Sequence, residues 1–164
     1  MSIQTIENLL RNENSVNPQQ IGFLLLNEFS MLAFASAVEP LRAANRQTGK
    51  SLYSWVIASP SGAAAIASNK VEVRTDGDPQ VLQNCRMVFV CAGVNVRNNT
   101  DKNILNLIRR LDRNGVIIGA ICTGTYVMAA AGLLDGRRCT IHWENIDGLS
   151  EEFPELEFTN DLFE

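Results

Sequence analysis

The chain has 164 residues, of which 46% are hydrophobic and 20% charged, the balance of one globular domain with a sizeable core. The formal net charge of −4, with no basic stripe interleaved with aromatic residues, argues against direct contact of this stretch with nucleic acid. No apolar run approaches the roughly 20 residues of a membrane span, and the first residues lack the features of a signal peptide. We therefore expect a cytoplasmic protein with no membrane contact.

The chain begins with a polar segment, followed by a strand and a helix. Residues 1–19 are rich in Asn and Gln and predict a flexible leader, with a helical turn around Ile6. The apolar run IGFLLL, residues 21–26, is typical of a central strand buried on both faces. Ser30 then stands at the N-cap position of a helix whose apolar residues recur at helical spacing: Met31, Phe34, Ala35, Val38 and Leu41. Pro40 should bend this helix or end its regular part.

Further strands and helices alternate along the rest of the chain. Buried strands are predicted for LYSWVIAS (52–59), RMVFVCAG (86–93) and VIIGAI (116–121), and a short strand off the main sheet for KVEVRT (70–75). Residues 100–115 predict a helix that begins at Thr100 and Asp101. Its apolar face contains Ile104, Leu105, Ile108 and Leu111, and its solvated end carries Arg109, Arg110 and Arg113. A helix rich in small residues follows at 126–134.

This alternation predicts one α/β domain over residues 20–164. A mostly parallel central sheet with right-handed crossovers would be covered by helices on both faces, which is a three-layer sandwich. The last residues, EFPELEFTNDLFE, look like a turn and the start of another strand. We therefore expect that the domain is truncated and that the natural protein continues beyond Glu164.

The segment most informative about chemistry is VIIGAICTGTYVMAAAGLL, in which a buried strand runs into Cys122 and a helix follows at once. Ala120 and Gly124 lie two residues to either side, and this A-x-C-x-G pattern parallels a nucleophile elbow, in which only small neighbours fit the sharp turn. The helix N-terminus and the amide of Thr123 would then face the sulfur. Gly93, at the end of the neighbouring strand, is a candidate second amide donor. The alternative is that Cys122 is a buried small residue in an ordinary turn.

The remaining cysteines predict neither disulfides nor a metal site. Cys85, Cys91 and Cys139 form no C-x-x-C pair, and the only histidine is His142, so no zinc ligand set is complete. We expect reduced thiols that pack in the core, with no metal and no cofactor.

The motifs AVEPLRAAN, AICTGTYVMAAAGLLDGRRCTIHWE and the CAG strand end carry a resemblance that extends from Ile21 to about Thr159. Over these residues the chain resembles the amino-terminal domain of GlxA-type regulators of the AraC/XylS group, which belongs to the PfpI-like, class I glutamine-amidotransferase-like superfamily. The resemblance implies a flavodoxin-like fold, a small-molecule effector, a homodimer, and DNA contact only through a C-terminal helix-turn-helix domain outside this chain. Related regulators respond to amino acids or quaternary amines such as carnitine and glycine betaine, which suggests the ligand class.

The same resemblance supplies a competing interpretation as an enzyme. Isonitrile hydratases and other PfpI-like enzymes share the cysteine elbow and act with a carboxylate placed just after the first strand. Alignment on that pattern puts the acid at or near Ala33, and alanine cannot shuttle a proton; Glu28 comes about five residues too early and Glu39 lies further into the helix. General acid-base help is typically worth about 10²- to 10⁴-fold, so the missing acid favours a sensor with a vestigial nucleophile.

The predicted ligand-binding set is drawn from the elbow and the T-x-H-W motif: Cys122, Thr123, Gly93, His142, Trp143 and Phe29. His142 is open to three interpretations: a structural hydrogen bond near the elbow, a pocket-lining residue, or a general base for the thiol. Trp143 belongs either to the core or to a crevice where its ring would hold a cation. Met31 and Phe34 are predicted core residues. A third function, redox sensing through Cys122, would require selective oxidation of that thiol.

Overall fold

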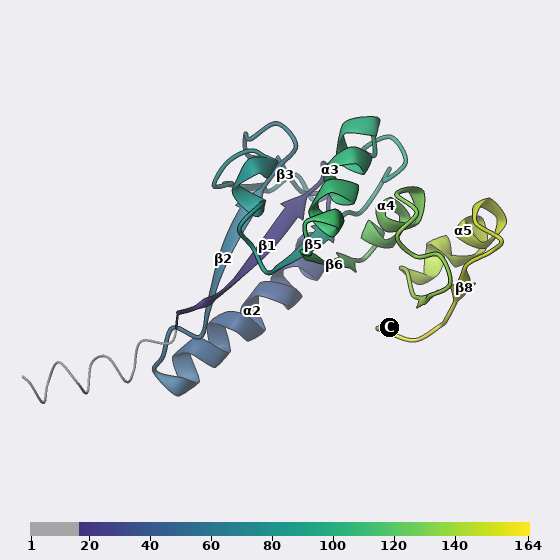
Figure 1. Cartoon of the computed structure of the whole chain (residues 1–164). Coiled ribbons are helices and arrows are strands. Elements are labelled where there is room, and N and C mark those ends of the chain that lie inside the picture. The colour runs from purple at the N-terminus through teal and green to yellow at the C-terminus, as the bar shows by residue number, and fades with distance from the viewer. Residues whose placement is uncertain (1–16) are drawn as a thin grey trace, which may run out of the picture.

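In a computed structural model of the chain, residues 17–164 are described (Figure 1). Most of the predicted leader, including the turn expected around Ile6, lies outside these residues. The main sheet has four strands, in the order β2-β1-β5-β6, and every neighbouring pair is parallel. The strands are β1 (Gln19–Leu25), β2 (Tyr53–Ala58), β5 (Met87–Cys91) and β6 (Ile117–Ile121). The four predicted main strands and their parallel arrangement are confirmed.

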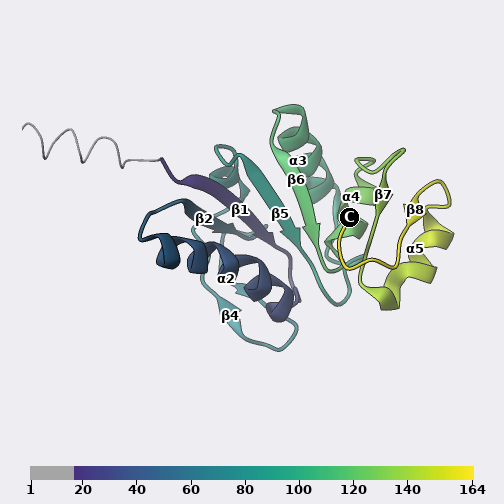
Figure 2. The ribbon, with the colours of Figure 1, turned by 90° about the horizontal axis from the view of Figure 1, so that it is seen from below.

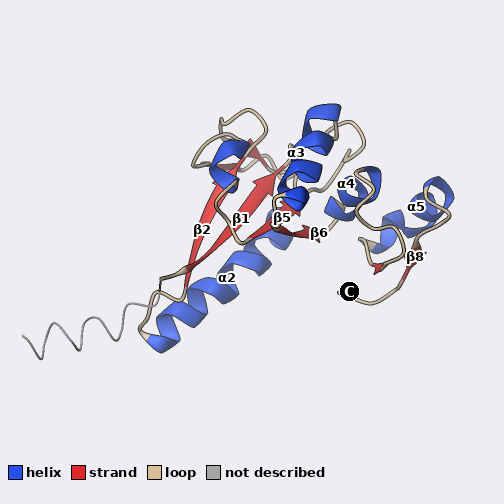
Figure 3. Ribbon diagram, viewed as in Figure 1, coloured by secondary structure: helices blue, strands red, loops and turns tan. Residues whose placement is uncertain are grey.

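Helices cover both faces of this sheet, which confirms the three-layer sandwich (Figures 2 and 3). The helices are α2 (Met31–Thr48) on one face, and α3 (Lys102–Arg113) and α4 (Gly124–Ala130) on the other. Side chains of β1 alternate between the two layers: Phe23 packs with Phe34 of α2, whereas Leu24 belongs to the cluster that contains Ile108 of α3. Phe23 and Leu24 are both fully buried, so β1 is the central strand that its apolar run predicts.

Helix α2 begins where its N-cap predicts, and it does not end at its proline. The Ser30 side chain accepts a hydrogen bond from the Ala33 amide at 3.3 Å. The helix continues past Pro40 to Thr48, so the expectation that Pro40 ends it is wrong, and the alternative of a bend at Pro40 stays a prediction. Pro40 and Ser36 are both exposed, and the carbonyl that loses its donor at Pro40 is therefore free to bond water.

Helix α3 is capped by Asp101, whose carboxylate accepts from the amides of Asn103 and Ile104, both at 2.9 Å. The buried face of α3 differs from the predicted one in one residue: Leu107 is buried, whereas the predicted Leu105 is only half-buried. The buried residues are Ile104, Leu107, Ile108 and Leu111. These positions follow the i, i+3, i+4, i+7 spacing of one helix face.

The arginines of α3 differ in their surroundings. Arg109 donates to the carbonyls of Ala131 and Ala130 at the end of α4, at 3.0 and 3.2 Å. Arg109 is exposed, as predicted for the helix end, and these two hydrogen bonds also join α3 to α4.

Two small sheets lie outside the main one. The antiparallel pair β3 (Ala65–Ile66) and β4 (Glu72–Val73) confirms the short strand predicted off the main sheet, and the 3-10 helix η1 (Pro79–Leu82) follows it. The remaining elements form what we call the C-terminal unit, residues 138–164: β7 (Arg138–Cys139), η2 (Trp143–Asn145), α5 (Ile146–Glu152) and β8 (Glu157–Phe158). The last strand, β8, pairs with β7 and not with the main sheet.

Strand β6 departs from the fully buried strand that its sequence predicts. Within residues 17–164 it has a neighbour on one side only, so it is an edge strand. Ile117 is exposed and the other four residues are half-buried. The run of apolar residues indicates a preference for burial, but it does not indicate whether a second neighbouring strand is present.

Within residues 17–164, no helix combines the length and the apolar composition that a membrane span requires.

Candidate functional site

The turn between β6 and α4 has the geometry of the predicted elbow. Cys122 adopts a φ of 59°, in the left-handed region that non-glycine residues rarely occupy. A Cβ atom on Gly124 would lie 2.2 Å from the carbonyl oxygen of Val90 and 3.5 Å from the Cβ of Ala120. No side chain fits in that space, so the small residue at position 124 is a requirement of the turn. The cysteine elbow predicted from A-x-C-x-G is confirmed.

Thr123 and Gly93 fix the elbow to the neighbouring strand ends. The buried hydroxyl of Thr123 donates to the carbonyl of Gly93 at 2.7 Å. A Cβ on Gly93 would lie 2.3 Å from the carbonyl oxygen of Glu28, so the loop between β1 and α2 packs directly against the end of β5. The carboxyl ends of β1, β5 and β6 thereby converge, as expected for the ligand edge of a parallel sheet.

An open cavity of about 1330 Å³ lies beside the elbow. Cys122 lines it together with Ser30 and Ala33 from the start of α2, and so do His142 and Trp143 from the C-terminal unit. The sulfur of Cys122 is therefore not packed away from a cavity. The structure brings these three members of the predicted ligand-binding set together, and their binding of a ligand stays a prediction.

The other three members of that set do not line the cavity. Thr123 and Gly93 lie behind the elbow, where they hold it in place. Phe29 is fully buried, with its ring 5.9 Å from that of Phe34 in an edge-to-face pair. A ligand in this cavity would not reach Phe29 as it is placed here. Sequence patterns cannot distinguish an aromatic residue in the core from one that lines a pocket at the same strand end.

No carboxylate of the β1–α2 region lines the cavity, whereas Ala33 does. Glu28 is engaged elsewhere: its carboxylate accepts from the Asn95 side-chain amide at 2.8 Å and lies 3.5 Å from the Lys70 amine. The bond from Asn95 lowers the pKa of Glu28, with a smaller contribution from Lys70. Glu39 pairs with Arg42 on the exposed side of α2. Ala33, the position at which the resemblance to PfpI-like enzymes predicts an acid, therefore contributes only a methyl group to the cavity.

The thiol of Cys122 is not activated by its surroundings. Burial raises its pKa most, a hydrogen bond with the backbone of Thr123 opposes that rise, and the nearby carboxylate of Glu144 raises the pKa further. The hydrogen bond with the backbone of Thr123 therefore does not outweigh desolvation, and the thiol is neutral near pH 7.

The raised pKa of Cys122 predicts slow alkylation at neutral pH. We expect the iodoacetamide rate at Cys122, followed by peptide mass spectrometry, to rise with pH and to reach half its maximum above the roughly 8.5 of an ordinary cysteine. The Cys122→Ser variant identifies the signal that belongs to this thiol. A midpoint below about 7.5 would instead show a thiolate of the kind that catalytic cysteines use.

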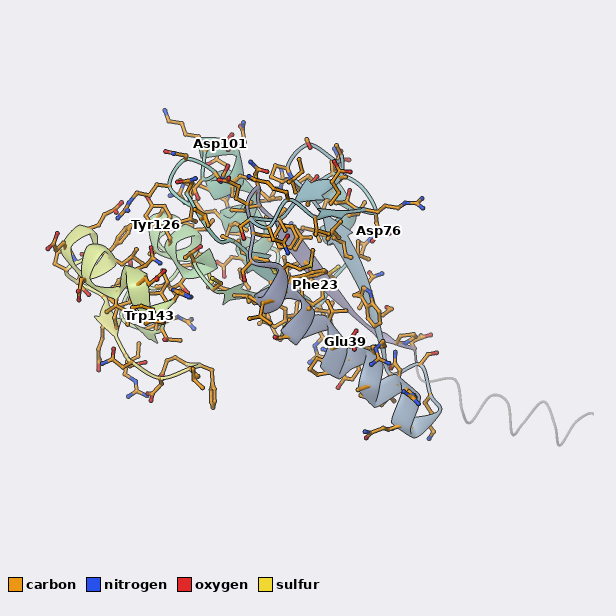
Figure 4. All side chains as sticks on the ribbon, turned by 180° about the vertical axis from the view of Figure 1, so that it is seen from behind. Phe23, Glu39, Asp76, Asp101, Tyr126 and Trp143 are labelled. Atoms are coloured by element: carbon orange, nitrogen blue, oxygen red, sulfur yellow. The ribbon has the colours of Figure 1, made fainter. Side chains whose placement is uncertain are left out.

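His142 and Trp143 form one aromatic wall of the cavity. Their rings stack with centroids 5.8 Å apart, and Trp143 remains 73% exposed. Figure 4 shows Trp143 on the C-terminal unit, away from Phe23 in the core. The Nδ1 atom of His142 lies 3.8 Å from the Glu144 carboxylate. Within the described residues, no hydrogen bond joins His142 to Cys122, and the three interpretations of His142 stay predictions.

A polar cluster holds this aromatic wall against the rest of the domain. The guanidinium of Arg97 donates to the carboxylate of Glu152 at 3.0 and 2.8 Å, and the hydroxyl of Tyr126 donates to the same carboxylate at 3.0 Å. The guanidinium carbon lies 5.5 Å from the centre of the Tyr126 ring. Because α5 follows directly after η2, this cluster fixes the segment that carries His142 and Trp143.

Several residues that line the cavity are not among the predicted ones: Ser30, Leu32, Ser36, Arg137 and Ile146. Ser30 and Ser36 lie three residues to either side of Ala33, and this helical spacing would have indicated them, whereas Leu32 is the direct neighbour of Ala33. Arg137 and Ile146 come from a segment whose path the sequence does not reveal. Within residues 17–164, no three side chains of His, Cys, Asp or Glu gather as a metal site would require.

Comparison with known proteins identifies the family of the chain and several relatives. The sequence profile of the DJ-1/PfpI family matches residues 20–158. The chain is 47% identical over 146 residues to the HTH-type transcriptional regulator CdhR of Pseudomonas aeruginosa, an alignment that covers 89% of this chain and 43% of that protein. It is 43% identical over 146 residues to the HTH-type transcriptional regulator GlxA of Rhizobium meliloti, which covers 88% and 45%. The chain thus spans less than half the length of these regulators.

A solved structure extends the comparison to the fold. The crystal structure of an AraC family transcriptional regulator from Pseudomonas putida has a TM-score of 0.76 and 26% identity, and the match covers 88% of this chain and 77% of that one. A shorter match reaches an isonitrile hydratase of Pseudomonas putida, 42% identical over 43 residues, or 26% of this chain and 19% of that enzyme. The resemblance to GlxA-type regulators predicted from the elbow and the T-x-H-W motif is confirmed.

Proposed function

Because this chain belongs to the DJ-1/PfpI family, we propose that it is the ligand-sensing and dimerisation domain of a cytoplasmic bacterial regulator of the AraC family and that it catalyses no reaction. One observation carries this proposal: Cys122 of the elbow and Ala33 line the same cavity, and Ala33 stands where the resemblance to PfpI-like enzymes puts their partner acid. The raised pKa of Cys122 supports it, since a neutral thiol is a poor nucleophile.

DNA binding would belong to a different part of the protein. We propose a helix-turn-helix domain beyond Glu164, because relatives named as HTH-type regulators are about twice as long as this chain. The net charge of −4 also supports the assignment of DNA binding to another domain, since contacts with DNA phosphates require basic residues. Dimerisation through this domain is testable by sedimentation of the 164-residue chain, and a monomer at all accessible concentrations would contradict it.

The ligand would be a small nitrogen-containing metabolite, an amino acid or a quaternary amine. The exposed ring of Trp143 offers a face on which an ammonium group can rest, and the nearby Glu144 adds negative charge. Arg137 lines the same cavity and offers a positive charge for a carboxylate. A zwitterion carries both groups, which is why this class fits the lining better than an uncharged metabolite does.

A ligand of this class should raise the melting temperature of the domain, because binding to the folded state stabilises it by mass action. We expect a saturable shift from at least one member of a panel of glycine betaine, carnitine and the common amino acids. Trp143→Ala should weaken the binding of that compound about tenfold, and Trp143→Phe should weaken it less, because a smaller aromatic face remains.

Ile66→Ala provides the matched control, because Ile66 is also an exposed apolar residue but does not line the cavity. Its dissociation constant should equal that of the unchanged chain. Equal binding by Trp143→Ala would contradict the assigned pocket, and the absence of a shift with every compound would contradict the ligand class.

The enzymatic alternative is a PfpI-like cysteine enzyme such as an isonitrile hydratase or an amidase, and the short hydratase match favours it. It predicts turnover of small amides or isonitriles that is lost in Cys122→Ser. We expect no turnover above the rate of that variant, measured by product formation over hours. Turnover that depends on Cys122 would overturn the receptor proposal whatever the result of the ligand panel.

A further inference from the structure

The aromatic wall of the cavity is attached to the rest of the domain by three side chains that lie outside the cavity. Both carboxylate oxygens of Glu152 are engaged: Oε2 accepts from the guanidinium of Arg97 and Oε1 from the hydroxyl of Tyr126. The guanidinium also packs over the ring of Tyr126. None of these three residues lines the cavity. We call the three side chains the Glu152 cluster.

Helix α5 connects the Glu152 cluster to the aromatic wall. Glu152 is the last residue of α5. Ile146, the first residue of α5, lines the cavity next to the wall formed by His142 and Trp143. A helix of seven residues is about 10 Å long, so the cluster acts on the wall from a distance. Within residues 17–164, every side-chain hydrogen bond that joins α5 to another element ends at Glu152. The place of Glu152 therefore determines how α5 and the wall are oriented.

The loop that carries Arg97, residues 92–99, is fixed to other parts of the cavity. The carbonyl of Gly93 accepts from the hydroxyl of Thr123, at the elbow. The side-chain amide of Asn95 donates to the carboxylate of Glu28, which lies just before α2. Figure 2 shows α2 and α5 apart from each other, with the end of β6 between them, and residues of both helices line the cavity. Through Arg97, the loop therefore links the elbow and the start of α2 to α5.

We propose that Arg97, Tyr126 and Glu152 are positioning residues of the effector site, which hold the aromatic wall in place and thereby set the width of the cavity between that wall and the start of α2. This inference rests on the proposed function, because the effector site is this same cavity. An isolated ion pair at the surface contributes little. Here one carboxylate binds an arginine from the loop after β5 and a tyrosine from α4, so its loss frees α5 from two elements at once.

The thiol of Cys122 reports the position of the wall without any effector. Burial raises the pKa of Cys122 most, the backbone of Thr123 opposes that rise, and the carboxylate of Glu144 raises the pKa further. Glu144 and His142 belong to the segment of the wall, so both move with it. Cys91, whose pKa is raised by burial and then by Cys122, belongs to β5 and stays in place. A wall that moves away would therefore expose the Cys122 thiol and lower its pKa.

Alkylation of Cys122 in the Arg97→Gln variant tests the proposal. We expect iodoacetamide to react with Cys122 at least about threefold faster near pH 8 than in the unchanged chain, with a midpoint at lower pH, because the thiol is less buried and farther from Glu144. Peptide mass spectrometry assigns the rate to this cysteine. The melting temperature should change little, because Arg97 and Glu152 are both partly exposed.

Two further variants separate the position of the wall from a change in net charge. The double variant Arg97→Glu, Glu152→Arg restores an ion pair at the same place, and the alkylation rate of Cys122 should return towards that of the unchanged chain. Arg42→Gln is the matched control, because Arg42 and Glu39 form a partly exposed ion pair within α2. This control should leave the alkylation rate of Cys122 unchanged.

The affinity for the effector supplies a second readout. The compound that raises the melting temperature of the unchanged chain should bind Arg97→Gln roughly fivefold more weakly, although Arg97 does not line the cavity. A panel in which no compound binds would contradict the ligand class and would leave the alkylation measurement intact.

Three results would overturn the proposal. Alkylation of Cys122 with the same rate and midpoint in Arg97→Gln as in the unchanged chain would show that the wall does not depend on the Glu152 cluster. An equal increase of the rate in Arg42→Gln, or no recovery in the charge-exchanged double variant, would assign the effect to net charge. Equal effector binding by Arg97→Gln and the unchanged chain would show that the position of the wall does not set the affinity.

Discussion

Replacement of Gly124 by alanine is expected to lower the free energy of unfolding by about 3 kcal/mol, or roughly 10 °C in melting temperature. The added Cβ would lie 2.2 Å from the carbonyl oxygen of Val90. That oxygen belongs to the backbone of a central strand, so no side-chain rotation relieves the clash. Either α4 must move away from the sheet or the elbow at Cys122 must open. Thermal denaturation followed by circular dichroism measures the effect.

Gly148→Ala is the matched control for this substitution. Gly148 lies in the exposed helix α5, and the nearest atom to its added Cβ is a nitrogen of Arg97 at 3.7 Å, an ordinary contact distance. Its stability should stay the same or rise by up to about 1 kcal/mol, because alanine favours helix more than glycine does. If Gly124→Ala melts within about 2 °C of the unchanged chain, the close approach of α4 to β5 is wrong.

Replacement of Leu107 by alanine is expected to lower the free energy of unfolding by about 3 kcal/mol. Leu107 is 5% exposed and packs in the cluster shared by α3 and the sheet. Its truncation removes buried apolar surface and leaves a cavity that neighbouring residues fill only in part. Urea denaturation, with the midpoint and slope compared between variants, measures the loss.

The stability loss of Leu105→Ala, set against that of Leu107→Ala, tests whether the predicted or the observed face of α3 is the buried one. Leu105 lies on the same helix but is only half-buried, so its truncation should cost about 1 kcal/mol. A larger loss for Leu105 than for Leu107 would mean that the helix is rotated towards the face that its sequence predicts.

Two features of the elbow both lower the reactivity of the Cys122 thiol. Ala33 supplies no proton-transfer group to the cavity, and burial keeps the thiol of Cys122 protonated. The free energy of unfolding should therefore depend on pH, because burial raises the pKa of Cys122 in the folded state above its value in the unfolded chain. The stabilising contribution of the protonated thiol is fully present below the unfolded pKa of about 8.5 and is lost as the pH rises through the folded pKa. Buried Cys85, Cys91 and Cys139 act in the same sense.

The features that the sequence determines by itself are those that depend on neighbours along the chain. The A-x-C-x-G elbow follows from steric limits within a five-residue turn, and the N-cap at Ser30 follows from one side chain and the first helical turn. The main strands follow from runs of apolar residues. The alanine at position 33 is read directly from the sequence, and the resemblance to PfpI-like enzymes marks that position as the place of their acid.

Other features were decided only by the tertiary structure. Phe29 lies in the core and Trp143 at the cavity, although both are aromatic residues near a predicted site. Arg109 joins α3 to α4, and β6 is an edge strand despite its apolar sequence. Each of these outcomes depends on which distant segment packs alongside. Local composition records the preference of a residue for burial or for a partner, but only the folded chain determines which partner is within reach.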